Sequence, residues 1–261
     1  MCYAYKDSEK EEDLIEHLIT TANICSERWE LKALALKTSK LLNIDVKKVE
    51  EAVILASMLH DIGKAAEIYQ SACSANKCAE FPGHYLVSAF ITHLTFNINN
   101  VNIGEEDIKK FLADDINSLG EDKIYAMLVV LPVALHHYHQ VRGFRSYSTS
   151  ESMTVLQFLE NPKMCVECLK EVKNMLSYER VGQSGRKLLE HLDAVLRNIE
   201  YYADKDVYRS SKIFIQNFYN VMGEDLKRFA EHPITLGKIL IESVYGLINL
   251  CDGSAASIKR R

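Results

Sequence analysis

The chain contains few of the residues that normally build turns. It has 11 glycines and 4 prolines in 261 residues, which is about half of their usual combined share. An all-β sandwich of this length needs many tight turns, and these two residues usually supply them, so that class is disfavoured. Collagen-like and low-complexity chains are excluded outright. The scarcity favours long helices joined by few sharp corners.

Other absences narrow the class of function. The longest apolar run, Ala126 to Leu135, is much shorter than the ~20 residues that a membrane-spanning helix needs. The N-terminus has no apolar segment of the secretory type, so we expect a cytoplasmic protein with no membrane contact. The net charge of −5 argues against a general basic coat for nucleic acid. The sequence has no GxxxxGK[ST] run, so we expect no P-loop ATPase here.

Seven cysteines are scattered along the chain. An odd number in a long chain suits reduced thiols better than a disulfide framework. Two spacings leave alternatives open. Cys73-x4-Cys78 and Cys165-x-x-Cys168 resemble the halves of a four-thiolate zinc site, and Cys73 and Cys78 can instead form a disulfide.

Apolar residues recur at helical spacing in most segments, and no alternating pattern predicts a sheet. Asp45 follows a turn-like Asn-Ile pair and is the expected N-cap of the next helix. Polar loops are predicted at 70–83, 97–104 and 141–150. One all-α domain over residues 1–261 is the simplest account. Helices are predicted over residues 10–22, 29–42, 46–60, 84–96, 105–118, 121–140, 151–160, 163–178, 184–203, 206–230 and 234–250.

Two dipeptides stand out among the nine histidines. His60-Asp61 ends an apolar helix in the run AVILASMLHDIGK, where burial of an ionised carboxylate is costly unless it is paired or bound to metal. The glycine that follows permits a sharp turn or close packing, and Lys64 brings a cation. His136-His137 follows a second apolar run, in which Pro132 kinks the helix or starts a new turn.

These motifs resemble the HD superfamily of metal-dependent phosphohydrolases. Within it, the chain most resembles the CRISPR-associated HD nuclease of type I interference, in its stand-alone archaeal form. The resemblance implies a single-domain, all-α helical bundle of the HD-domain type. The matching segments span almost the whole chain and are His17 in LIEHLITTA, His60-Asp61 in LHDIGK, His84 in PGHYLVSAF, His136-His137 in ALHHYHQ and Asp252 in LINLCDGSAAS.

The resemblance also implies a centre of two divalent metal ions. Imidazole ligands suit Mn, Co, Ni or Fe, and carboxylates keep the site tolerant of Mg. Two metals about 3.5–4 Å apart can clamp a phosphodiester and activate water. Asp61 would bridge the ions, and Lys64 would stabilise the transition-state charge, so both are predicted catalytic residues. His17, His60 and Asp252 would complete the first metal site, and His84, His136 and His137 the second.

Simpler interpretations compete with these roles. His17 can be a satisfied core histidine, His84 a surface histidine, and Lys64 an ordinary exposed lysine. Asp252 can be a cap or turn residue before Gly253. Four other aspartates rival it by composition: Asp193, Asp204, Asp206 and Asp225.

The loop after the histidine pair offers candidate substrate contacts. Arg142 and Arg145 can hold phosphates, and His139 can contact substrate or support a ligand. A solvated surface loop is an equally simple interpretation of this segment.

The expected function is a nuclease that hydrolyses phosphodiester bonds of single-stranded DNA, or RNA, in CRISPR type I interference. Because the chain ends after the HD domain, we expect a separate helicase subunit and an RNA-guided surveillance complex as partners. One alternative is an HD phosphohydrolase that acts on small or cyclic nucleotides. Another is a non-catalytic HD-like subunit with a structural metal.

Overall fold

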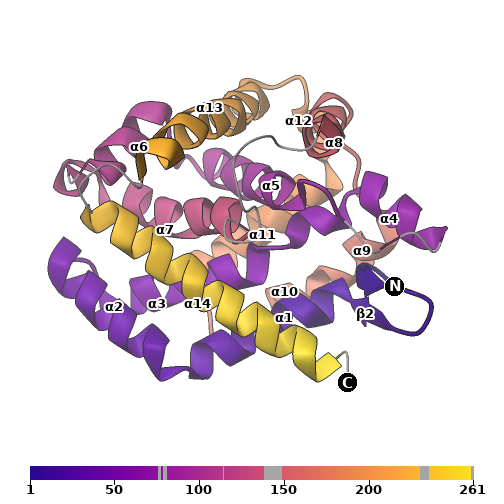
Figure 1. The fold of residues 1–261 in the computed structure, drawn as a ribbon, viewed down its shortest axis with the longest axis horizontal. Coiled ribbons are helices and arrows are strands. Elements are labelled where there is room, and N and C mark those ends of the chain that lie inside the picture. Colours follow the sequence, from indigo (N-terminus) through magenta and orange to yellow (C-terminus); the bar gives the residue numbers. More distant parts are fainter. Residues whose placement is uncertain (76–77, 79–80, 114, 138–148, 230–234, 260–261) are drawn as a thin grey trace.

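The computed structural model describes residues 1–75, 78, 81–113, 115–137, 149–229 and 235–259. Within these ranges the fold is all-α, as the sequence predicts, apart from one short antiparallel hairpin (Figure 1). Among the helices so described, none combines the length and apolar character needed to cross a membrane. The strands are β1 (Tyr3–Lys6) and β2 (Glu11–Asp13), and the helices are α1 (Leu14–Glu27), α2 (Trp29–Leu42), α3 (Val46–Leu59), η1 (Ile62–Ala65), α4 (Glu67–Ser74), α5 (His84–Ile98), α6 (Glu105–Leu112), η2 (Ile116–Ser118), α7 (Glu121–Leu135), α8 (Thr149–Glu160), α9 (Val166–Glu171), α10 (Lys173–Leu176), α11 (Gln183–Arg197), α12 (Ile199–Tyr202), α13 (Asp206–Phe229) and α14 (Leu236–Lys259).

Helices α3, α5 and α7 form the centre of the molecule. Helix α3 packs against α1, α2 and α7, while α5 packs against η1, α7, α11 and α13. Helix α5 is buried from His84 to Asn97, and α7 is buried from Ile124 to Leu135. A helix that is apolar around its whole circumference is stable only inside a protein. Polar side chains at the ends of these helices therefore need partners within the fold.

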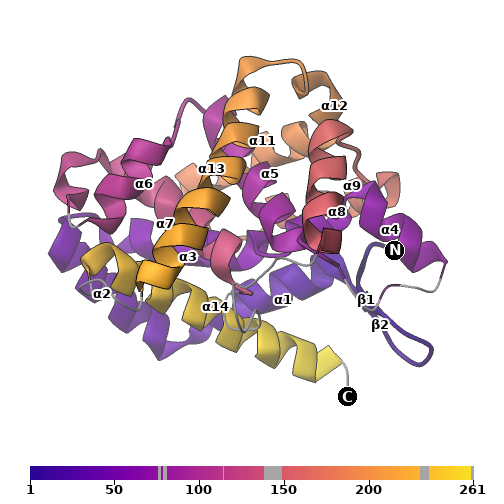
Figure 2. The ribbon, with the colours of Figure 1, turned by 45° about the horizontal axis from the view of Figure 1, so that its top comes forward.

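The last helix returns to the first one. Helix α14 packs along α1 and also contacts α3 and α7, so the first and last α-helices lie side by side (Figures 1 and 2). A disulfide joins Cys25 of α1 to Cys251 of α14. The predicted helix over 234–250 ends too early, because α14 continues through Asp252 to Lys259. Asp252 consequently lies inside a helix and is not a turn residue.

Two N-terminal elements differ from the prediction. The predicted helix over 10–22 starts at Leu14, with Asp13 as its N-cap, because the preceding residues form strand β2. The strands are four and three residues long, which is too short for alternation to be recognised in the sequence. Helix α4 occupies part of the predicted loop over 70–83, and it buries Tyr69 and Cys73 on one face.

The prediction of reduced thiols is wrong, because six of the seven cysteines form disulfides. Cys165 is left as a thiol, which accounts for the odd number. The pairing of Cys168 with Cys2 also excludes the four-thiolate zinc site, whereas the predicted alternative of a Cys73–Cys78 disulfide is confirmed. Two of the pairs join cysteines 166 and 226 residues apart, so only the folded chain reveals them. The disulfides are Cys2–Cys168, Cys25–Cys251 and Cys73–Cys78.

Candidate metal centre

Seven side chains from five segments of the chain converge on one region. They come from α1, the turn after α3, the start of α5, the end of α7 and α14. Within each of two groups, the candidate ligand atoms all lie within 4.8 Å of one another. One group is His17, His60 and Asp252, and the other is Asp61, His84, His136 and His137.

Asp61 faces both groups. Its Oδ1 lies 2.9 Å from Nε2 of His84 and 3.2 Å from Nε2 of His136. Its Oδ2 lies 3.6 Å from Nε2 of His60 and 2.5 Å from Nζ of Lys64. One carboxylate oxygen is thus directed at each group, which is the geometry that a bridging ligand requires.

Lys64 is nearly buried beside this carboxylate. Its side chain is 12% exposed, and its ammonium lies 5.0 Å from the centre of the Phe81 ring. These contacts exclude the interpretation of Lys64 as an ordinary exposed lysine.

Gly63 allows the turn after α3 to lie directly on α5. A Cβ atom at Gly63 would collide with the carbonyl oxygen of His84 and lie 2.6 Å from the amide nitrogen of Ser88. The Gly63 amide donates to Oγ of Ser88 at 2.8 Å. The close-packing interpretation of this glycine is confirmed, and the contact brings Asp61 beside His84.

His84 and His136 both lie at a helix end, His84 at the start of α5 and His136 at the end of α7. Gly83 adopts the left-handed conformation with φ of 72°, which glycine tolerates best, and α5 begins at the next residue. His136 caps the C-terminus of α7, so its side chain is not restricted to the face of a continuous helix.

Backbone carbonyls orient three of the imidazole rings. Each Nδ1 donates to the carbonyl oxygen three residues earlier. A carbonyl can only accept, so each Nδ1 carries a hydrogen and Nε2 is the ring nitrogen that points into the centre. The pairs are His60 with Ser57 at 2.8 Å, His84 with Phe81 at 2.5 Å and His136 with Val133 at 2.6 Å.

The centre therefore places Nε2 atoms against one another and against carboxylate oxygens. Nε2 of His84 lies 2.9 Å from a carboxylate oxygen of Asp61 and 2.9 Å from Nε2 of His137. Nε2 of His60 is buried and has no hydrogen-bond partner among the described residues. Imidazole nitrogens and carboxylate oxygens gathered at these distances can serve together as ligands of a cation. The nitrogen and oxygen donors suit a divalent transition metal, so the residues present fit the metal that the resemblance implies.

At Asp61, His136 and His137, the electrostatic environment favours the deprotonated forms that bind metal. Burial by itself raises the pKa of Asp61, but Lys64, His60, His84 and the His136 hydrogen bond outweigh it and hold that pKa well below its ordinary value. Burial lowers the pKa of His136 to about 4. Burial, together with the neighbouring His136 and His84, lowers the pKa of His137 to about 2.

In the first group, the Nδ1 atom of His17 contacts a carboxylate instead of a backbone carbonyl. Nε2 of His17 lies 3.0 Å from Oδ1 of Asp252, while its Nδ1 lies 2.8 Å from Oε1 of Glu12. Burial lowers the pKa of His17, but hydrogen bonds to Asp252 and Glu12 outweigh it and raise that pKa to about 9. The two carboxylates thus favour positive charge at this position. Sequence reasoning missed Glu12, because it lies in an acidic run that resembles a solvated surface.

The competing candidates lie in other environments. Asp193 pairs with Arg197 at 2.8 Å, and Asp206 pairs with Arg209 at 3.2 Å. His93 also lies elsewhere, with its two ring nitrogens 2.9 Å from Oγ of Ser211 and the carbonyl oxygen of Ile103.

Three predicted substrate contacts lie outside the described residues. His139, Arg142 and Arg145 therefore remain predictions from the sequence.

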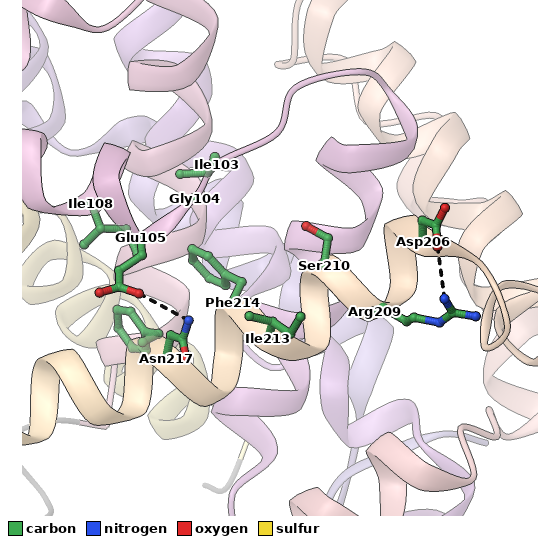
Figure 3. Close-up of a pocket in the computed structure, with 11 residues that line it drawn as sticks. Ile103, Gly104, Glu105, Ile108, Asp206, Arg209, Ser210, Ile213, Phe214 and Asn217 are labelled. Carbon is green, nitrogen blue, oxygen red and sulfur yellow. Dashed lines mark hydrogen bonds and ion pairs between the residues drawn. The ribbon is translucent and has the colours of Figure 1, made fainter.

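A cavity of about 330 Å³ lies between α6 and α13 (Figure 3). Its lining is largely apolar and includes Ile108 and Phe214. Four polar side chains on its wall are hydrogen-bonded in two pairs. Asn217 donates to Glu105 at 3.3 Å, and Arg209 donates to Asp206. The cavity contains none of the predicted site residues, so the metal centre is the stronger functional candidate.

Comparison with known proteins finds a family and a curated relative that the chain resembles. The family described as "Cas3, HD domain" matches residues 4–137. A curated protein of Methanocaldococcus jannaschii, the CRISPR-associated endonuclease Cas3-HD, is 35% identical over 143 residues, which cover 51% of this chain and 48% of that protein. The chain thus spans about half the length of this relative. The family match includes every predicted ligand except Asp252.

Proposed function

Because the chain belongs to the Cas3 HD-domain family, we propose that it is a nuclease that hydrolyses phosphodiester bonds of single-stranded DNA with two divalent metal ions. One observation carries the proposal: two groups of ligands share the single carboxylate of Asp61. A mononuclear site would need fewer ligands than the seven that converge here.

We assign each group to one metal ion. His17, His60 and Asp252 would hold the first, His84, His136 and His137 would hold the second, and Asp61 would bridge them. Mn, Co, Ni, Fe and Mg remain candidates, with the imidazole-rich donor set favouring the transition metals over Mg. Bound ions would polarise the phosphodiester and activate a water molecule as the nucleophile.

The chain's own residues prepare the site for this chemistry. The carbonyls of Ser57, Phe81 and Val133 fix the rings that they contact, so little reorganisation is needed when a substrate binds. The ammonium of Lys64, beside Asp61, would stabilise the extra negative charge of the phosphoryl transition state. The contact with Asp61 holds this ammonium at the edge of the centre, beside the carboxylate that would bridge the metals.

The wider context is also a proposal. The M. jannaschii relative is described as a CRISPR-associated endonuclease, which supports a role in type I interference. We propose that a separate helicase subunit and an RNA-guided surveillance complex deliver the single strand. We also retain Arg142, Arg145 and His139 as proposed contacts to that strand.

Cleavage assays test the proposal directly. Labelled single-stranded DNA, duplex DNA, single-stranded RNA and free nucleotides are incubated with the purified protein and Mn²⁺, Co²⁺, Ni²⁺, Fe²⁺ or Mg²⁺. We expect cleavage of single-stranded DNA with Mn²⁺ or Co²⁺ and its abolition by Asp61→Ala. Lys64→Ala should still bind two metals but cleave about 10²–10³-fold more slowly.

Asp193→Ala is the matched control, because it removes a carboxylate that pairs with Arg197 outside the centre. It should cleave like the wild type. Metal-loaded protein that cuts no nucleic acid would overturn the proposal. Hydrolysis of free or cyclic nucleotides alone would favour the small-nucleotide phosphohydrolase, and loss of folding in every ligand variant would favour a structural metal.

A further inference from the structure

We propose that Glu12 is a positioning residue of the first metal group, because its carboxylate orients the His17 ring so that Nε2 faces Asp252. The inference rests on the proposed metal centre and adds a residue that lies before every motif of the resemblance. Glu12 would touch neither metal nor substrate, and it would act on the metal through His17.

The need for Glu12 follows from the place of His17 in its helix. His60, His84 and His136 lie at helix ends, where a carbonyl three residues earlier is available to Nδ1. His17 lies within α1, where carbonyl oxygens point along the axis and accept from the next turn. A ring in that position needs a side-chain partner to fix its tautomer, and Oε1 of Glu12 lies 2.8 Å from Nδ1.

Strand β2 positions the carboxylate of Glu12. Successive side chains of a strand point to opposite faces, and here Glu11 is exposed whereas Glu12 is 4% exposed. The next residue, Asp13, caps α1 by accepting from the amide of Glu16 at 2.9 Å. The strand therefore ends where the helix begins, which places the Glu12 carboxylate beside His17.

The hairpin is anchored on its other side. The side chain of Gln70 accepts from the amide of Tyr3 and donates to the Tyr3 carbonyl, both at 2.9 Å. Cys2 is bonded to Cys168, and Tyr5 is paired with Glu12 across the two strands. These contacts fix β1, and β1 fixes the register of β2.

A carboxylate behind a ligating histidine has a known physical effect. It fixes the ring orientation and raises the basicity of the ligating nitrogen, and its loss typically weakens metal binding 10–100-fold. Burial of a carboxylate is costly without a strong donor, and the Nδ1–H group of His17 is such a donor. The arrangement therefore couples the buried carboxylate of Glu12 directly to a proposed ligand of the first metal.

Calorimetric titration with Mn²⁺ alone tests the inference. We expect two binding steps for the wild type. Glu12→Ala should weaken one step 10–100-fold and leave the other unchanged. Glu12→Gln should weaken the same step less, because its amide oxygen still accepts from Nδ1. Glu11→Gln removes the same charge from the exposed face of β2 and should titrate like the wild type.

A double-mutant cycle separates positioning from a structural role. In a His17→Ala background, Glu12→Ala should cause no further loss of Mn²⁺ affinity, although the single Glu12→Ala variant shows the loss. Two unchanged steps in Glu12→Ala, or equal weakening of both steps, would overturn the inference while the proposed metal centre stands. A wild-type protein that binds no metal would overturn the proposed function together with this inference.

Discussion

At the residue scale, His93 and the proposed ligands are buried histidines with different environments. His93 stacks on Phe214 with ring centres 3.8 Å apart, and its ring nitrogens contact Ser211 and Ile103. No carboxylate is among these contacts. Burial lowers its pKa to about 4, so His93 is neutral in the folded protein near neutral pH. A histidine without a charged partner is thus suited to the core but costs stability in acid.

This difference predicts a pH dependence of stability. Between about pH 6.5 and pH 4, the unfolded chain binds a proton that folded His93 does not, so acidification through this window destabilises the fold. We expect His93 to contribute a loss of about 2 kcal/mol between pH 7 and pH 5. Denaturant unfolding of His93→Gln should show a correspondingly flatter pH dependence, whatever its stability at pH 7. Parallel curves for variant and wild type would contradict this prediction.

At the element scale, the position of α5 in the metal centre depends on its close packing against η1 at Gly63. Gly63→Ala would place a methyl group against the carbonyl of His84 and the amide of Ser88. Because backbone atoms cannot rotate away, α5 must shift and His84 must move from Asp61. We expect a loss of about 1–3 kcal/mol of stability and weaker binding at the second metal site, measured by thermal unfolding and Mn²⁺ titration.

Gly246→Ala is the control for this substitution. An added Cβ at Gly246, in α14, meets nothing within 4 Å, and alanine favours a helix over glycine by about 1 kcal/mol. This variant should be as stable as the wild type or more so. If both variants behaved alike, the close contact at Gly63 would not limit the position of α5.

The elements also show how much could be predicted from the sequence. Helical periodicity and the capping side chain of Asp45, which accepts from the amide of Lys47 at 2.7 Å, follow from local physics and were predictable. The HDIGK motif and the histidine pair indicated the family, and the structure brings the side chains they predict together. The roles of those side chains as ligands stay predictions until metal is measured.

The missed features depend on contacts between distant residues. Strand β2 is short and acidic, so nothing local distinguishes Glu12 from its exposed neighbour Glu11. The carbonyl of Phe81 orients His84 only because the chain turns at Gly83. Backbone carbonyls are common to all sequences, and a pattern of side chains cannot reveal which of them a histidine will contact.

At the scale of the whole molecule, α14 determines whether the first metal group can form. It packs on α1, α3 and α7 and brings Asp252 to His17, although these two residues lie near opposite ends of the chain. We propose on this basis that residues 1–261 form a single domain. The proposal predicts one cooperative unfolding transition, because α1 cannot lose its contacts without exposing α14.

The Cys25–Cys251 disulfide reinforces this closure, and its removal should cost more than that of Cys73–Cys78. A cross-link restricts the unfolded chain more when it closes a longer loop, and the two pairs are separated by 226 and 5 residues. Chain entropy predicts a loss of about 5.5 kcal/mol for Cys25→Ala with Cys251→Ala, against about 2 kcal/mol for Cys73→Ala with Cys78→Ala. Denaturant unfolding under oxidising conditions measures both, and the same experiment in dithiothreitol is the control. Reduction should bring the wild type close to the double variants, since the cross-links are then absent from every protein. Equal losses for the two pairs, or a difference that persists in dithiothreitol, would show that side-chain packing and not loop closure determines the effect.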